Sequence, residues 1–176
     1  MAGVSVAAWL VATVASGGNS SLEILFGMIG PLVAASGSWV LAERTFWDKI
    51  IIIHGVKSWF GKRGALRGEG QRVSRHYYDL HRIFQSDLGA QAVADRALGV
   101  DCVAHARMFF NSPDLGLDHA VPGTFSLMPT DEMIEDLRRD YSRMAGMIIG
   151  DPPKFDEVMA SIGALEEELN RRMAQQ

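Results

Sequence analysis

Three features of the sequence predict a mainly α-helical protein. Apolar residues recur at intervals of three and four over residues 134–148 and again over residues 155–169, which is the period of an amphipathic helix. Thr130 precedes the first of these segments as a favourable N-cap, and two acidic residues follow it. Residues 41–59 form a third, strongly apolar segment with helical spacing. Its β-branched run at residues 50–53 would also suit a strand, and we favour the helix.

The composition is that of a folded protein with a sizeable core. The chain has 176 residues, of which 48% are hydrophobic and 22% charged, and this excludes a chain that is disordered as a whole. The single cysteine, Cys102, excludes an internal disulfide framework and fits a reducing compartment. Its apolar neighbours indicate a small buried side chain rather than a nucleophile.

Charge is distributed unevenly along the chain. Residues 1–42 contain no Lys or Arg and one acid, Glu23. Residues 57–82 carry seven Lys or Arg against two acids, whereas residues 131–168 carry eleven acids against four Lys or Arg. The chain therefore runs from apolar, through basic, to acidic.

The apolar N-terminal segment, residues 1–42, has two interpretations. Residues 22–42 are about as long as the roughly 20 apolar residues that cross a bilayer, and residues 4–42 could form a membrane hairpin. The basic residues that follow would then place residues 43–176 in the cytoplasm. Alternatively, the segment is the remnant of a truncated soluble domain, because Gly27, Gly30 and Pro31 interrupt it. On that reading the protein is cytoplasmic.

The rest of the chain is predicted to be helical with one long irregular stretch. We expect helices over residues 73–84 and 91–110, irregular structure over residues 111–129, and two helices over residues 130–149 and 155–170. The simplest packing of the last two is an antiparallel pair, with Glu166, Glu167 and Glu168 on a solvated face. Residues 61–70 form a basic loop without the spacing of a phosphate-cradling P-loop.

Four sequence blocks occur in order and together carry a family resemblance. Residues 43–49 read ERTFWDK and residues 74–80 read SRHYYDL. The third block comprises residues 105–110 and 122–129 (PGTFSLMP), and the fourth comprises residues 137–144 (LRRDYSRM), 147–156 and 165–170. Over residues 43–176 the chain thus resembles the C-terminal part of the AbiEii-type nucleotidyltransferase toxins.

The resemblance implies a fold, a reaction and partners. The fold would be the helical C-terminal region of a nucleotidyltransferase-type α/β protein. The activity would be transfer of a nucleotide from an NTP, with Mg²⁺, to an acceptor such as RNA, by a toxin of a toxin–antitoxin or abortive-infection system. A separately encoded antitoxin would be its partner. Phosphoryl transfer of this kind depends mainly on positioning and on charge stabilisation.

The candidate site residues are carried over from matching positions. Lys49 matches a lysine that contacts nucleotide phosphates, and Asp79 matches an acidic residue that would accept a proton or organise the lysine. Arg75 and His76 are further candidates for phosphate binding. Lys49 and Asp79 each have a structural alternative. Lys49 could be an interfacial lysine with a buried stem, and Asp79 could be a salt-bridge partner of Arg75 or His76. His54 is expected to be a packed helix histidine.

One part of the family pattern is missing. The family's first motif is a Gly-Ser pair followed by an Asp-x-Asp that coordinates the metals, and no Asp-x-Asp precedes Glu43. No metal ligand is therefore assigned, and we expect a truncated member that is inactive alone or needs a partner. The alternative is a membrane-anchored helical binding module without catalysis. In that case the acidic residues 131–168 would bind a partner, and the basic residues 57–82 would meet lipid headgroups or RNA.

Overall fold

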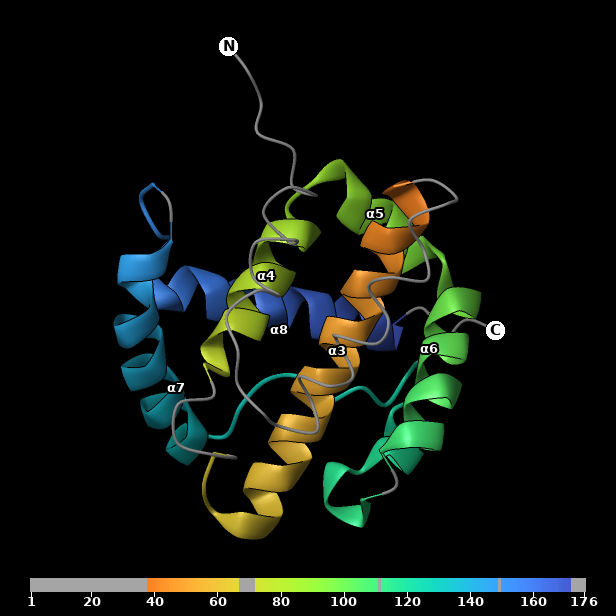
Figure 1. The fold of residues 1–176 in the computed structure, drawn as a ribbon, viewed down its shortest axis with the longest axis horizontal. Coiled ribbons are helices and arrows are strands. Elements are labelled where there is room, and N and C mark those ends of the chain that lie inside the picture. Colours follow the sequence, from red (N-terminus) through yellow and green to blue (C-terminus); the bar gives the residue numbers. More distant parts are fainter. Residues whose placement is uncertain (1–37, 67–71, 111, 149, 172–176) are drawn as a thin grey trace. The chain divides into compact units, whose positions relative to one another are not determined.

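The structure, a computed structural model, describes residues 38–66, 72–110, 112–148 and 150–171. Within these ranges it contains six α-helices, three single-turn 3₁₀ segments and no strand (Figure 1). The helices are α3 (Ser38–Arg63), α4 (Ser74–Phe84), α5 (Asp87–Ala94), α6 (Arg96–Phe109), α7 (Asp131–Met144) and α8 (Phe155–Arg171). The prediction of a mainly α-helical fold is confirmed.

The apolar N-terminal segment falls almost wholly outside these ranges. Both interpretations of residues 1–42, membrane hairpin and domain remnant, concern residues that lie mostly outside the described part of the chain. Among the helices that the structure does describe, none is both long enough and apolar enough to cross a membrane.

α3 is the central helix of the fold. Its apolar side chains between residues 46 and 60 are buried except Trp59, which is partly exposed, and Phe46, Trp47, Ile50 and Ile53 have no exposed surface. A helix that is apolar all round must be covered by several neighbours. The helix predicted at residues 41–59 is confirmed, and the strand alternative at residues 50–53 is wrong.

α3 continues beyond its predicted end. It runs through Lys62 and Arg63, which were expected to lie in the basic loop. Two cations in the last turn interact favourably with the negative end of the helix dipole. The helix then closes with a hydrogen bond of 2.7 Å from the Gly64 N–H to the Phe60 carbonyl oxygen.

The single helix predicted over residues 91–110 is in fact two helices, α5 and α6, separated at Asp95. The backbone of Asp95 leaves the helical region, with φ −83° and ψ 74°. Its carboxylate accepts a hydrogen bond of 3.0 Å from the Leu98 N–H and so caps the start of α6. Aspartate competes with helix continuation in this way, and the sequence pattern alone did not reveal the break.

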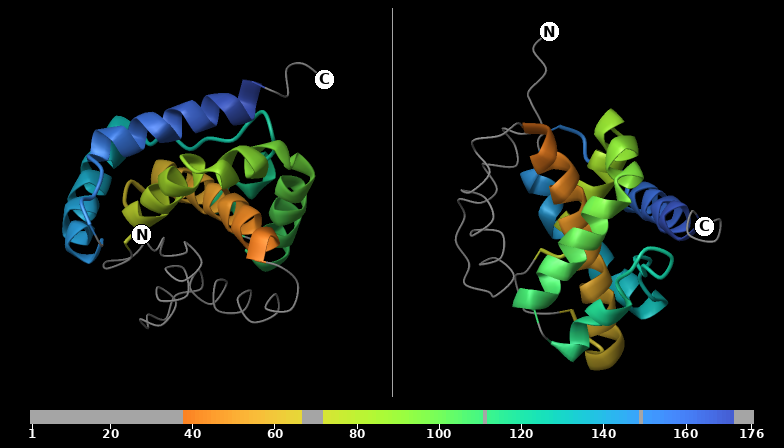
Figure 2. Two further views of the ribbon diagram at one scale, coloured as in Figure 1. Left: turned by 90° about the horizontal axis from the view of Figure 1, so that it is seen from above. Right: turned by 90° about the vertical axis from the view of Figure 1, so that its right-hand side faces the viewer.

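α7 and α8 both pack against α4 rather than along each other (Figure 2). They meet only at a corner, where the Tyr141 hydroxyl donates to the Pro153 carbonyl oxygen at 2.8 Å and Arg138 lies 4.7 Å from the centre of the Phe155 ring. The predicted antiparallel pair is therefore wrong. The apolar stripes of the two helices are buried, but α4 is the neighbour that covers them.

The irregular stretch predicted at residues 111–129 is confirmed over residues 112–129, the part of it that the structure describes. Two 3₁₀ turns, Pro113–Leu115 and Leu117–His119, flank Gly116. Gly116 has φ +59°, and a Cβ atom there would lie 2.5 Å from the Ser58 hydroxyl of α3. Glycine meets both the backbone and the steric demand at this contact.

Side chains of α8 hold the end of this stretch. The Glu166 carboxylate accepts hydrogen bonds from the Leu127 and Met128 N–H groups, the latter at 2.8 Å. Asn170 donates to the Phe125 carbonyl oxygen at 2.9 Å and accepts from its N–H at 3.1 Å. Glu166 was predicted to be solvated, and this prediction is wrong: its carboxylate satisfies backbone donors that have no regular partner.

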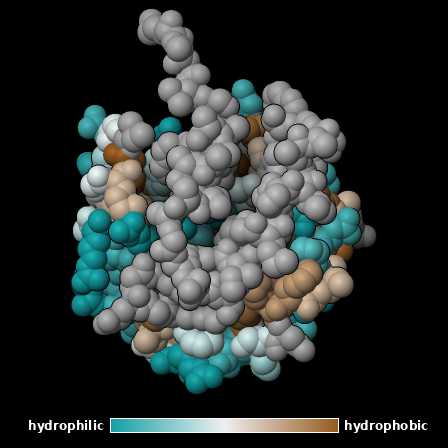
Figure 3. All heavy atoms as spheres, viewed as in Figure 1, coloured by the Kyte–Doolittle hydropathy of each residue, from teal (hydrophilic) through white to brown (hydrophobic). Residues whose placement is uncertain are grey.

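The surface of the helical part is uneven in polarity. Hydrophilic side chains cover the outer side of α7, at the left edge of Figure 3, while more hydrophobic ones gather towards the lower right. On α6, Val100 is 52% exposed, Met108 77% and Phe109 62%. Scattered exposed apolar side chains are common on soluble proteins and assign no function by themselves.

A close helix contact supplies the first testable prediction. A Cβ atom on Gly99 of α6 would lie 2.8 Å from the buried ring of Trp47, so Gly99→Ala is expected to lower the free energy of unfolding by about 1–3 kcal/mol. Gly163→Ala is the matched control, because its nearest neighbour is the Met128 sulfur at 3.6 Å. Urea denaturation measures both, and equal effects would contradict the prediction.

Candidate functional site

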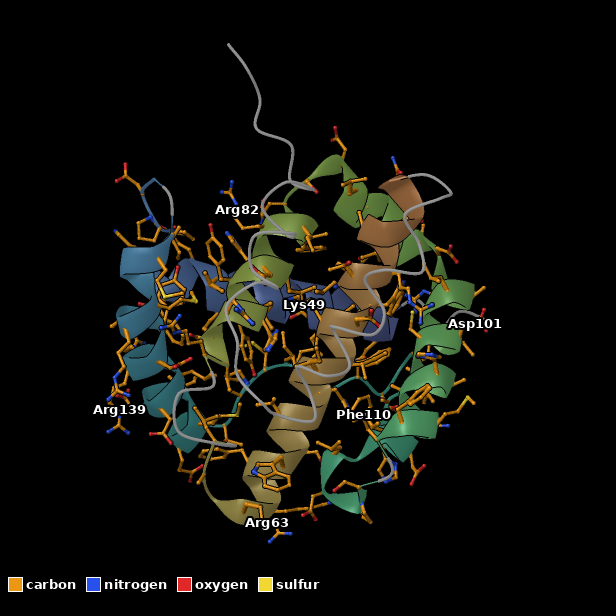
Figure 4. All side chains as sticks on the ribbon, viewed as in Figure 1. Lys49, Arg63, Arg82, Asp101, Phe110 and Arg139 are labelled. Atoms are coloured by element: carbon orange, nitrogen blue, oxygen red, sulfur yellow. The ribbon has the colours of Figure 1, made fainter. Side chains whose placement is uncertain are left out.

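A buried ion pair joins α3 to α4. The Lys49 ammonium lies 2.6 Å from Asp79 Oδ2, and the two residues are 6% and 8% exposed. Lys49 lies between the two helices near the middle of Figure 4. Thirty residues separate the pair in the sequence, and both were site candidates there. Buried charges are rare unless paired, so this pair marks a place where two helices share a polar contact inside an apolar fold.

His76 belongs to the same cluster. Its Nδ1 lies 3.3 Å from the Lys49 ammonium. An ammonium is a donor only, so Nδ1 accepts and the ring is neutral. Burial lowers the pKa of His76 well below its usual value, and the charges of Lys49 and Arg75 lower it further. Among the described residues, Asp79 forms its ion pair with Lys49 rather than with Arg75 or His76.

Several buried side-chain atoms on these two helices lack a hydrogen-bond partner. Within the described part of the chain they are Asp79 Oδ1, which belongs to the pair itself, and Arg44 Nε, Arg75 Nε, Tyr77 Oη and His81 Nδ1. A buried donor or acceptor without a partner costs roughly 1–3 kcal/mol. A polar ligand could supply hydrogen-bond partners to these unsatisfied donors and acceptors.

The cluster carries an excess of positive charge. Around the ion pair, Lys49 and Arg75 contribute two cations and Asp79 contributes one carboxylate, while Arg44 and Asp48 of α3 carry one charge of each sign. Burial raises the pKa of Asp48 to about 6, although the nearby charges of Arg44 and Lys49 act in the opposite direction. As pH falls towards 6, Asp48 gains a proton and the excess of positive charge grows. This balance suits an anion better than a cation.

The residues present do not fit Mg²⁺. Across residues 38–66, 72–110, 112–148 and 150–171, no three His, Cys, Asp or Glu side chains come together as metal ligands would. Asp79 is a single carboxylate, and one of its oxygens is already bound by the Lys49 ammonium. A divalent ion needs several oxygen ligands and gains nothing from neighbouring cations. No step of a reaction is therefore assigned to a metal held by these residues.

The position of α4 depends on α7. Val73 offers no side-chain cap at the start of α4. Instead, Asp140 Oδ2 accepts hydrogen bonds from the Ser74 N–H at 2.8 Å and from the Ser74 hydroxyl at 2.6 Å. A carboxylate at a helix N-terminus satisfies free N–H groups and favours the dipole. Asp140 lies inside the LRRDYSRM block, but local spacing gives no sign of this long-range contact.

Two further residues that could take part in chemistry lie in the core. Tyr77 is fully buried, and burial, with the charge of Glu166, raises the pKa of its hydroxyl. Cys102 is also buried, and burial raises the pKa of its thiol to about 12. A thiol with that pKa carries almost no thiolate at neutral pH and is a poor nucleophile.

Comparison with known proteins adds the family. A search of curated proteins and a search of solved structures found no match to this chain. A family model described as "Nucleotidyl transferase AbiEii toxin, Type IV TA system" matches residues 40–161, which include Lys49, Arg75, His76 and Asp79. The match spans most of the chain. It covers α3 from residue 40 on and the whole of α4, α5, α6 and α7. The chain therefore belongs to the AbiEii family of nucleotidyl transferase toxins of type IV toxin–antitoxin systems.

Proposed function

We propose that residues 43–176 are the helical, nucleotide-binding region of a nucleotidyltransferase toxin, and that residues 1–42 are a separate segment. The donor substrate is an NTP with its Mg²⁺, and the acceptor is an RNA. A separately encoded antitoxin is the partner. The single observation that supports the site is the buried pair of Lys49 and Asp79, joined by partly buried His76, with the unpartnered Nε of Arg75, the residue before His76.

Each residue has a distinct part in this proposal. Lys49 and Arg75 contact phosphate oxygens, the first as a point charge and the second through its planar guanidinium. Asp79 holds the Lys49 ammonium at 2.6 Å and so fixes where the positive charge lies. Neutral His76 accepts from the same ammonium and restricts it further. Asp79 and His76 are therefore positioning residues, and Lys49 and Arg75 bind the ligand.

We also propose that this chain does not transfer nucleotides by itself. The described residues hold no set of metal ligands, and phosphoryl transfer in this family's manner needs Mg²⁺ to stabilise charge. Another polypeptide segment would have to supply the carboxylates. Binding and transfer are therefore separable, and each has its own test.

Calorimetric titration with ATP, GTP, CTP and UTP, each with Mg²⁺, tests binding. We expect Arg75→Gln to weaken the affinity for the preferred nucleotide about 10- to 100-fold, which is the loss of one charge-assisted contact. Arg82→Gln is the matched control, because it changes an exposed arginine of the same helix. Absence of binding for all four nucleotides, or equal effects of the two variants, would contradict the proposed site.

Incubation with labelled NTPs and RNA tests transfer. No label should reach RNA when this chain is alone. If the natural protein labels RNA and Lys49→Ala does not, this result would overturn the proposal of inactivity and would support the site at the same time.

The membrane-anchored binding module stays an alternative. Part of its basic surface is already occupied: Lys57 donates to the Ser126 hydroxyl, Lys62 to the Pro113 carbonyl oxygen, and Arg63 to Asp114. Cell fractionation separates the two proposals. If residues 1–42 anchor the protein, only detergent should extract it from the membrane fraction. Release of the protein by buffer alone would agree with a cytoplasmic protein.

A further inference from the structure

A strap of chain, residues 113–127, crosses the C-terminal half of α3. Three cations of α3 fasten it: Lys57 to Ser126, Lys62 to Pro113, and Arg63 to Asp114. The apolar side of the strap enters the core through Phe125, whose ring centre lies 5.9 Å from that of Trp47. The strap is therefore part of the folded structure although it has little regular secondary structure.

One side chain, His54, bridges two points of the strap that are ten residues apart. Its Nδ1 lies 3.2 Å from the Ser126 backbone nitrogen, and its Nε2 lies 3.1 Å from the Gly116 carbonyl oxygen. A backbone N–H only donates, so Nδ1 must accept; a carbonyl oxygen only accepts, so Nε2 must donate. These two bonds are made together by one form of the ring, the neutral tautomer with its proton on Nε2.

A proton on Nδ1 would break one of these bonds and keep the other. Nε2–H still donates to Gly116, but Nδ1–H then faces the N–H of Ser126, and two donors cannot share a hydrogen bond. Rotating the ring does not help, because both nitrogens of a charged imidazole are donors. The Ser126 N–H would be left without its partner in a half-buried position.

The surroundings also act on the charge of the ring. Lys57 on α3 and His119 on the strap oppose a positive charge, while Glu166 on α8 and the Gly116 carbonyl favour it. The Phe125 ring meets His54 edge to face at 6.1 Å and contributes to its burial. Burial is the largest effect, and the pKa of His54 lies below its usual value.

We propose that His54 is a proton-operated latch: neutral, it ties both Gly116 and Ser126 to α3, and on protonation it releases the Ser126 N–H. The opening is confined by its neighbours, since Lys57 still holds the Ser126 hydroxyl, Asn170 still holds Phe125 and Glu166 still holds Leu127. The latch uses none of the residues proposed for the nucleotide site on α3 and α4. It makes the strap responsive to acidification while the helical frame stays folded.

The direction of the pH effect follows from linkage. Because the pKa of His54 is lower in the folded protein than in the unfolded chain, the unfolded chain takes up the proton first. The contribution of His54 to stability is complete above the unfolded pKa of about 6.5 and declines as pH falls from there towards the folded pKa.

Amide hydrogen exchange of the whole protein, followed by NMR between pH 8 and pH 5, tests the latch. After correction for the intrinsic rate, we expect the exchange rate of the Ser126 amide to rise at least about tenfold between pH 8 and pH 5. This rise corresponds to the loss of one hydrogen bond. Amides in α7 and α8 should keep their protection. Unchanged protection of Ser126, or an equal rise in α7 and α8, would overturn the proposal.

Two variants and one direct measurement complete the test. His54→Gln has a side chain that does not titrate and should abolish the pH dependence of the Ser126 amide. His119→Gln changes the exposed neighbouring histidine and should leave that dependence in place. Should His54→Gln fail to fold, the ring nitrogen shifts of the natural protein decide: a proton on Nδ1 at pH 8 would refute the latch.

Discussion

Asp79→Ala should lower the free energy of unfolding by about 3–5 kcal/mol, because it leaves the ammonium of Lys49 buried without its carboxylate. The effect is large because both partners are almost inaccessible to water. Chemical denaturation followed by circular dichroism measures it. Asp156→Ala is the matched control, since its ion pair with Arg138 is exposed and worth at most about 1 kcal/mol.

The double variant Lys49→Met/Asp79→Leu separates a structural from a functional role. It removes both charges of the pair together, so stability should return to within about 1–2 kcal/mol of the natural protein. Nucleotide binding, in contrast, should not return, because the phosphate-binding charge is gone. A double variant as unstable as Asp79→Ala would contradict the interpretation of the pair. A double variant that still binds nucleotide would remove Lys49 from the site.

Glu166→Ala is the second large effect, with an expected loss of about 2–3 kcal/mol. Its carboxylate accepts from the Leu127 and Met128 N–H groups, and both would be left without a partner in a half-buried segment. Glu166→Gln keeps one acceptor oxygen and should lose less.

Glu167→Ala is the control for this prediction. It removes the same side chain one position along α8, where the carboxylate is 75% exposed and pairs with Arg171. Its effect should stay below about 0.5 kcal/mol, as for other exposed helix pairs. Denaturation midpoints for the three variants measure the difference. Similar losses at positions 166 and 167 would show that the clamp on Leu127 and Met128 does not stabilise the fold.

Much of the helical structure was predictable because it depends on local spacing. The apolar run of α3, the N-cap of α7, the apolar stripes of α7 and α8, and the irregular stretch between α6 and α7 all follow from residues within a few positions of each other. Two local predictions were wrong. The break at Asp95 depends on a side chain that caps the next helix rather than continuing the previous one. The end of α3 depends on cations that were assigned to a loop.

The partners of the helices were not predictable from spacing. A stripe of apolar residues shows which face of a helix is buried but not which neighbour buries it. For that reason the expected pair of α7 and α8 was wrong, although both stripes are buried. The same limit explains why the role of Asp140 was not predicted: it caps α4 across a separation of 66 residues.

The amino-acid sequence was sufficient to predict the helical class, most helix positions and the family resemblance, and it named Lys49, Arg75, His76 and Asp79 as candidate site residues. The packing of the helices was needed to show that Lys49 pairs with Asp79, that His54 bridges Gly116 and Ser126, and that Glu166 differs from Glu167 and Glu168. The physical reason is that a hydrogen bond or ion pair forms only within about 3–4 Å. Periodicity along the chain reports which side of a helix faces inward, whereas such distances depend on how separate helices pack.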